Sequence, residues 1–180
     1  MPNQKSSTRA KVIDRMPEPL LVRDVMRIGV PTCKLEDTLA RVAVLMIDGG
    51  HSAVVVLDEE ADTRGWINER MLARAYEQAA ARHEEASDLV AQDVMDEYVP
   101  ECPSDIPLAA AAQLMADAGV DHLFFLHHAG GRTWPASVLS RRDLVRVLAG
   151  PEYIKDQGIC APRPTPMDLF RQRYGTAKGR

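Results

Sequence analysis

Apolar residues recur along the first half of the chain at two different spacings. Within residues 35–50 they stand at positions 39, 42, 43 and 46, which is the spacing of one face of a helix. The next run, SAVVVLD at residues 52–58, is rich in β-branched side chains and has the length of a strand. A polar turn, EEADTRG, leads to a second short strand, GWIN, and then to a helical pattern over residues 69–86. With a short extended piece before the first helix, the pattern predicts a unit of order β-α-β-β-α.

The chain repeats itself after 69 residues. Thirteen of the 27 positions from 24 to 50 are identical to their counterparts from 93 to 119, with no gap. The clearest match sets DVMRIGVPTC, which begins at Asp24, against DVMDEYVPEC, which begins at Asp93. Because the whole order of elements recurs, the repeat indicates that the fold itself is doubled.

The second unit has its own signals for each element. Strands are predicted over residues 122–128 and 136–140, joined by a polar turn in HAGGRTWP, and a helix closes the unit over residues 141–150. Pro107 suits the start of its first helix, and Gly119 suits the end.

In the first unit, Asp37 or Thr38 can cap the first helix, and Gly49 with Gly50 can stop it. Strands this short cannot bury both faces of a sheet alone, so the two units must pack on each other. The predicted fold class is α+β, with two β-α-β-β-α repeats packed as a pseudo-two-fold pair.

We expect four segments along the chain. Residues 1–18 form a flexible N-terminal segment, residues 19–86 and 87–150 are the two repeats, and residues 151–180 form a C-terminal tail. The tail carries spaced prolines and then MDLFRQRY, a short helical pattern. Two interpretations of the tail stay open: a disordered extension, or a segment that packs on a dimer mate or another partner.

Composition narrows the function classes. The chain has 46% hydrophobic and 27% charged residues, as soluble globular proteins do. Its net charge of −4 disfavours nucleic-acid binding, and no apolar run reaches the roughly 18 residues of a membrane span. The N-terminus lacks the apolar core of a signal peptide, and three cysteines make no disulfide framework, so we expect a cytoplasmic protein. No nucleophile elbow, P-loop, dinucleotide-binding or zinc-hydrolase motif is present, so the sequence does not predict an enzyme.

Cys33 and Cys102 occupy matched positions in the two repeats. Metal binding would need a second Cys or a His at short spacing, and neither cysteine has one. We expect both to be small, buried hydrophobic side chains.

The ordered set of segments resembles a tandem pair of cystathionine-β-synthase (CBS) domains, called a Bateman module. The resemblance covers residues 20–150 and is carried by VRDVM and AQDVM, the helix ends LMIDGG and LMADAG, the strands VVVLD and LFFLH, and the closing segments GWINERML and SVLSRRDL. In that family the pair forms a disc with two clefts, and many members bind adenosine-containing ligands there. The resemblance implies a stand-alone regulatory homodimer without a cofactor. It implies AMP, ADP, ATP or S-adenosylmethionine as the regulatory ligand, and an unidentified regulated protein as a partner.

The family reads its ligand with the pattern Gly-hydrophobic-x-[Ser/Thr]-x-x-Asp. The second copy, residues 137–143, matches this pattern except for Ser137 at the leading position. The resemblance therefore implies that Ser140 binds a phosphate of the ligand and that Asp143 binds its ribose. In the first copy Asn68 can still bind a phosphate, but Met71 cannot hold a ribose. One cleft is therefore expected to be competent and the other degraded.

The resemblance also implies ligand contacts from the extended piece of each copy and from the start of the last helix. The residues concerned are Pro31, Thr32, Cys33, Val99, Pro100 and Cys102 beside the base, and Arg141 and Arg142 beside the phosphates.

Each of these features has a simpler interpretation as well. Ser140 and Asp143 would serve equally as a helix cap and a first-turn acid, and Arg141 and Arg142 as a solvated helix face. The alternative function is a ligand-free interaction module, a dimeric scaffold that docks on a partner through its faces and its C-terminal tail.

Overall fold

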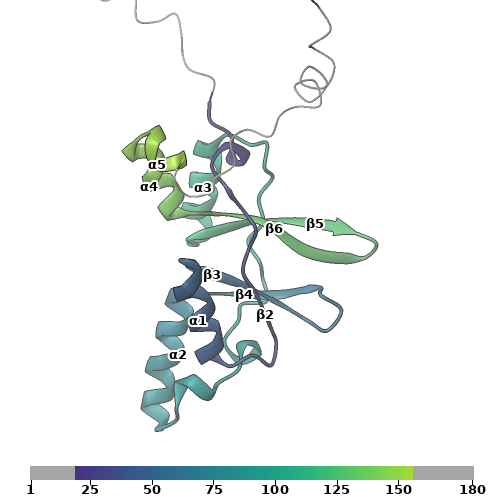
Figure 1. Cartoon of the computed structure of the whole chain (residues 1–180), viewed down its shortest axis with the longest axis vertical. Helices are drawn as coiled ribbons and strands as arrows, with labels where there is room; N and C mark the ends of the chain where they lie inside the picture. The colour runs from purple at the N-terminus through teal and green to yellow at the C-terminus, as the bar shows by residue number, and fades with distance from the viewer. Residues whose placement is uncertain (1–18, 156–180) are drawn as a thin grey trace, which may run out of the picture.

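Two three-stranded sheets stack at the centre of the molecule, with the helices of the first repeat on the outer face of one sheet and those of the second repeat on the outer face of the other (Figure 1). The structure is a computed structural model, and it describes residues 19–155. The predicted N-terminal segment, 1–18, and most of the predicted tail, 156–180, lie outside the described residues. The elements follow in the order β1 (Arg27–Ile28), β2 (Thr32–Lys34), α1 (Leu39–Gly49), β3 (Ala53–Leu57), β4 (Thr63–Asn68), α2 (Glu69–Arg82), α3 (Leu108–Ala118), β5 (His122–Ala129), β6 (Arg132–Ser140), α4 (Arg141–Ala149) and α5 (Pro151–Lys155). The predicted α+β class and paired repeats are confirmed.

The first helix of each repeat begins and ends where the sequence supplies caps. The Thr38 hydroxyl accepts the amide of Arg41 at the start of α1, and Gly50, with φ of +61°, ends that helix in the left-handed region. Pro107 precedes α3, and Gly119 ends it in the same way. No helix within residues 19–155 is long and apolar enough to span a membrane.

The strands are ordered β2-β3-β4 in one sheet and β1-β6-β5 in the other, and they differ from the prediction in two places. The opening strand of the second repeat is reduced to a single bridge between Glu101 and Phe124, where the first repeat pairs β2 with β3. The β5–β6 hairpin is longer than predicted. Residues 128–135 were expected to form a turn, but only Gly130 and Gly131, both with positive φ, lie outside the strands.

The opening segment of each repeat packs on the other repeat. The amide of Val22 donates to the carbonyl of Ile106 at 3.0 Å, and the amide of Ala91 donates to the carbonyl of Asp37 at 2.8 Å. These two contacts are equivalent, because the residues correspond under the shift of 69. In the same way β1 pairs with β6, while Asp96 of the second repeat bridges to β4.

We call this mutual packing of the opening segments the exchange. It completes the core beside the helices in both repeats. Val22 and Val25 pack among second-repeat side chains such as Met115, and Ala91 packs among first-repeat side chains such as Val42. Neither repeat therefore has a complete core of its own. A third cluster holds the two sheets together, and its buried members are Ala53, Val55, Trp66, Phe124, Leu126 and Val138.

Gly65 marks the point where the opening segment of the second repeat crosses β4. A Cβ atom there would lie 2.7 Å from the carbonyl oxygen of Asp96 and 2.8 Å from Sδ of Met95, so the crossing leaves no room for a side chain. At the equivalent crossing Ser137 is accommodated, and its hydroxyl donates to Sδ of Met26 at 3.1 Å.

Replacing Phe124 by Ala tests the core between the sheets. Phe124 is fully buried and its ring meets Trp66 edge-on, with centroids 5.5 Å apart. The cavity left behind should lower the free energy of unfolding by about 3–5 kcal/mol in chemical denaturation. Tyr98→Ala, at a position that is 76% exposed, should change it by no more than about 0.5 kcal/mol. Equal effects for the two variants would contradict this packing.

Candidate functional site

A polar cavity of about 400 Å³ lies where the two repeats meet at the starts of their last helices. We call it the central cavity. Its lining is nearly two-fold symmetric, because most members come in pairs that correspond between the repeats, such as Ser52 with Asp121 and Asn68 with Ser140. The lining residues are Ser52, Asn68, Glu69, Arg70, Asp121, His122, Ser140, Arg141 and Arg142.

The N-termini of α2 and α4 both reach the central cavity. Asn68 caps α2, with its side-chain oxygen accepting the amide of Met71 at 2.9 Å, and Ser140 caps α4. The first-turn amides of a helix have no partner within it, and its N-terminus carries a partial positive charge. Two helices that start at one cavity therefore favour a negatively charged ligand there.

The side chains around the cavity carry three positive and two negative charges. Arg141 pairs with Asp121 at 2.7 Å, and a guanidinium nitrogen of Arg70 donates to the carbonyl of Gly119 at 3.3 Å, which joins α2 to the second repeat. Arg142 and Glu69 complete the charged set. The excess of positive charge adds to the effect of the helix ends.

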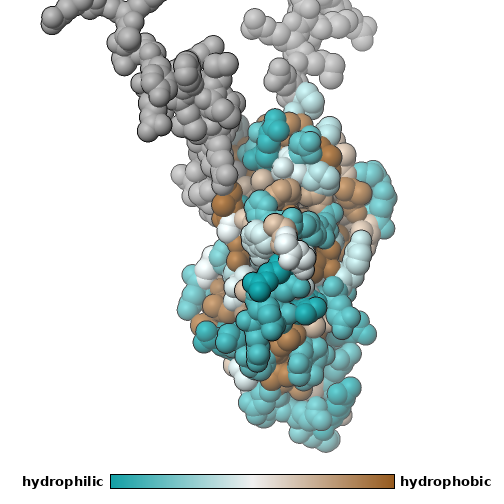
Figure 2. All heavy atoms as spheres, turned by 90° about the vertical axis from the view of Figure 1, so that its right-hand side faces the viewer, coloured by the Kyte–Doolittle hydropathy of each residue, from teal (hydrophilic) through white to brown (hydrophobic). Residues whose placement is uncertain are grey.

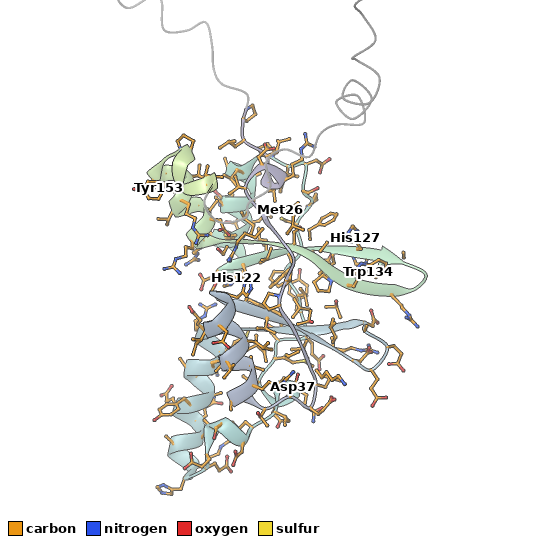
Figure 3. The ribbon with its side chains drawn as sticks, viewed as in Figure 1. Met26, Asp37, His122, His127, Trp134 and Tyr153 are labelled. Atoms are coloured by element: carbon orange, nitrogen blue, oxygen red, sulfur yellow. The ribbon has the colours of Figure 1, made fainter. Side chains whose placement is uncertain are left out.

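His122 lies at the junction of the two repeats (Figure 3). Its Nε2 is 2.7 Å from the hydroxyl of Ser52 in the first repeat, and its Nδ1 is buried with no partner among the described residues. Burial lowers the pKa of this imidazole to about 4, helped by Arg27 and Arg141 and opposed by Asp121 and Asp143. His122 is therefore neutral at pH 7.

Asp143, the predicted ribose ligand, is fully buried directly behind Ser140. One carboxylate oxygen accepts the amide of Ser140 at 2.8 Å and its hydroxyl at 2.6 Å. The other oxygen lies 2.7 Å from Arg146 and 3.6 Å from Arg27. Both oxygens of Asp143 thus have partners within the protein, and the contact with Arg27 is the longest of the four.

A second cavity of about 330 Å³ adjoins the central one and shares Ser52, Glu69 and Arg142 with it. We call it the side cavity. Its remaining wall is mainly apolar and includes Ala43, Met46, Ile47 and Leu72, together with Arg27, Gly50 and His51. The two cavities thus adjoin through shared lining residues, one being polar and the other more apolar, and we call the pair the cleft.

The first repeat has a different environment at the position equivalent to Asp143. Met71 lines an outer cavity of about 620 Å³ together with the acidic residues Asp93, Asp96 and Glu97. Asp96 corresponds to Arg27 under the shift of 69, so a carboxylate lies near Met71 where a guanidinium lies near Asp143. This environment is less favourable to an anion than that of the central cavity.

A family model described as CBS domain matches residues 22–78 and 90–150 of the chain. The chain belongs to the CBS domain family. It holds two such domains in tandem, and a pair of CBS domains is a regulatory module. A search of curated proteins found no match.

Several solved structures have the same fold. The CBS-domain containing protein ATU1752 from Agrobacterium tumefaciens is 21% identical, with a TM-score of 0.61 over 71% of this chain and 92% of that one. An uncharacterized conserved protein from Pyrococcus horikoshii is 14% identical, with a TM-score of 0.61 over 74% and 95%. The CBS domain pair of protein MJ0100, solved in complex with 5′-methylthioadenosine and S-adenosyl-L-methionine, is 17% identical, with a TM-score of 0.58 over 72% and 99%.

Four of the residues predicted to bind the ligand of this CBS pair line the central cavity: Asn68, Ser140, Arg141 and Arg142. The sequence analysis did not include Ser52, Arg70 or His122 in the site. Arg70 could have been inferred, because it stands in the first copy where Arg142 stands in the second. Ser52 and His122 belong to no binding pattern and meet only through the contact between the repeats.

The residues predicted to lie beside the base fall in the extended pieces instead. The carbonyls of Pro31 and Pro100 accept the amides of Val55 and Phe124 at 2.9 and 2.8 Å, so these main-chain groups pair with strands. The other four are Thr32, Cys33, Val99 and Cys102, and none of the six lines the central or the side cavity. Their contact with a ligand stays a prediction.

Both matched cysteines are buried, as expected. Burial raises the pKa of Cys33 to about 12 and that of Cys102 to about 11, so both remain thiols at neutral pH. Within residues 19–155, no group of three or more His, Cys, Asp or Glu side chains is placed to hold a metal ion.

Acid should destabilise the protein through His122. Because the pKa in the folded state is about 4 and the usual value is 6.5, the neutral ring contributes stability above pH 6.5 that is lost as the pH falls toward 4. Relative to His122→Gln, whose amide cannot titrate, wild type should lose as much as about 3 kcal/mol of unfolding free energy over this range. His127→Gln, at an exposed position of the same strand, is the control. Parallel pH profiles for wild type and His122→Gln would refute the assignment.

Proposed function

We propose that this CBS pair is a regulatory module that binds an adenine nucleotide or a related adenosyl ligand in the cleft of the central and side cavities. The observation that carries the proposal is that a polar and a more apolar cavity adjoin and share the lining residues Ser52, Glu69 and Arg142. A nucleotide has a flat, largely apolar ring at one end and polar groups at the other, and the cleft offers an environment suited to each.

We propose that the carboxylate of Asp143 accepts hydrogen bonds from the ribose hydroxyls. This carboxylate stands behind the cap of α4, and Arg27, its most distant partner at 3.6 Å, also lines the side cavity. Ribose hydroxyls would take the place of Arg27 on the outer oxygen, while Ser140 keeps the inner one. The adenosyl ligands in the structure of MJ0100 support this class of ligand for the fold.

The geometry favours one ligand for each chain. Met71 offers no hydrogen-bonding group at the position of Asp143, and the outer cavity beside it is lined by three carboxylates. The chemistry that the ligand regulates would belong to a partner protein, for which the CBS pair acts as the sensor.

We further propose that the module acts as a homodimer joined through its helices. Large apolar side chains are exposed on the helices of both repeats. Among them, Tyr76 on α2 and Leu148 on α4 are 71% and 87% exposed and occupy equivalent positions in the two repeats. A face that repeats its own pattern suits a second copy related by a two-fold axis. The opposite face, seen in Figure 2, is mostly hydrophilic with hydrophobic residues scattered through it.

Calorimetry with AMP, ADP, ATP and S-adenosylmethionine tests the ligand proposal. We expect saturable binding of at least one of them and at least tenfold weaker binding by Asp143→Asn, because a hydrogen bond to a charged group is worth about 1.5–3 kcal/mol. Met71→Leu, at the equivalent position of the first repeat, is the matched control and should bind as wild type does. Absence of heat with all four ligands, or unchanged binding by Asp143→Asn, would exclude the proposal.

Sedimentation of Leu148→Glu and of Tyr76→Glu tests the dimer. Wild type should sediment as a dimer, and each charge placed in a desolvated interface should shift it toward the monomer. Tyr98→Glu, at an equally exposed position outside the helices, should leave the mass unchanged. A monomeric wild type would rule the dimer out.

A further inference from the structure

The side chain of Asn68 has an unmet hydrogen-bond donor in the central cavity. Its oxygen is committed to the amide of Met71, which fixes the orientation of the amide group. Its nitrogen, Nδ2, is buried in a residue that is 2% exposed and has no partner among the described residues. Buried amide groups are almost always hydrogen-bonded, so this donor indicates that an acceptor belongs in the cavity.

Ser140, the equivalent residue of the second repeat, cannot play this part as it stands. Its hydroxyl donates to Asp143 at 2.6 Å and accepts the amide of that residue at 3.4 Å. In the second repeat, whose pattern is intact, Ser140 therefore hydrogen-bonds within the protein. In the first repeat, whose pattern is degraded, Asn68 has the donor without a partner among the described residues. The donor on Asn68 agrees with the expectation that this residue can still bind a phosphate, whereas Ser140 was expected to do so and has no free donor.

The surroundings of Nδ2 define the kind of acceptor. The helices that start at the cavity, α2 and α4, have 14 and 9 residues, and each directs its first-turn amides and positive end toward it. Arg70 and Arg142 add two further positive charges, against the carboxylate of Glu69, while Arg141 and Asp121 neutralise each other. An acceptor that carries negative charge fits this environment best.

We infer that the central cavity is an oxyanion site, organised by Asn68, that makes this CBS pair selective for phosphorylated adenine nucleotides over uncharged or cationic adenosyl compounds. The inference deepens the proposed function and rests on it. A phosphate oxygen accepts from Nδ2 of Asn68 and lies between the ends of α2 and α4. 5′-Methylthioadenosine has no anionic group to place there, and the sulfonium of S-adenosylmethionine is repelled by the arginines.

Asn68→Asp is the sharpest variant, because it replaces the donor Nδ2 by a carboxylate oxygen of the same shape. Aspartate caps helices as well as asparagine does, so α2 keeps its start. Gln78→Glu makes the same change of charge on an exposed part of the same helix, about 15 Å away by the rise of the helix, and serves as the matched control. Asn68→Ser, which keeps a cap oxygen but lacks the amide donor, is the second variant in case the first fails to fold.

Calorimetry should use pyrophosphate, AMP, ADP, ATP, adenosine, 5′-methylthioadenosine and S-adenosylmethionine. We expect wild type and Gln78→Glu to bind pyrophosphate and the nucleotides, with adenosine and S-adenosylmethionine at least tenfold weaker than ATP. Asn68→Asp should weaken the phosphorylated ligands by about 10- to 100-fold, the equivalent of one charge-assisted hydrogen bond, and leave adenosine unchanged.

The possible failures are distinguishable. If adenosine or S-adenosylmethionine binds as tightly as ATP and Asn68→Asp changes nothing, the oxyanion site is overturned and the adenosyl-ligand proposal stands. If pyrophosphate binds but no adenine compound does, the oxyanion site stands, while the selectivity for adenine nucleotides and the proposed function fall. Absence of binding by all seven compounds overturns both.

Discussion

The reciprocal hydrogen bonds of the two opening segments determine the rest of this structure. Through Val22 to Ile106 and Ala91 to Asp37, each repeat supplies the segment that closes the other. The buried surface of each half is then partly made by its neighbour, so packing of the halves is a condition of folding rather than a later docking step. The same exchange brings the starts of α2 and α4 together at the central cavity.

The backbone is nearly symmetric, and the differences lie in a few side chains placed on it. Corresponding positions hold Asn68 and Ser140, Met71 and Asp143, Asp96 and Arg27, and each pair differs in charge or in hydrogen-bonding capacity. Because the scaffold places both members of a pair equivalently, these differences convert two similar clefts into one basic cleft and one acidic cavity. A symmetric frame with unlike side chains is sufficient to define a single site.

Sequence periodicity predicted the elements well, because helix faces, β-branched runs and the caps at Thr38 and Gly50 are local signals. The exchange of segments could not be predicted from the sequence, because a repeat of 69 residues is equally consistent with pairing inside each copy or between the copies. The site was only partly predictable for the same reason. The bond of His122 to Ser52 and the occupation of Asp143 by Arg27 join residues far apart in the chain, and no pattern records them.

The exchange also places the first and the last described residues on the same repeat. Leu20 accepts the amide of Leu108 at the start of α3, so the first described residues lie on the second repeat, as α4 and α5 do (Figure 1). From one end β1 leads to Arg27, and from the other α4 leads to Arg142, and both arginines line the side cavity. The segment that enters the first repeat and the helix that closes the second thus each contribute one arginine to the same cavity, so both ends of the described chain have a charged side chain at the cleft.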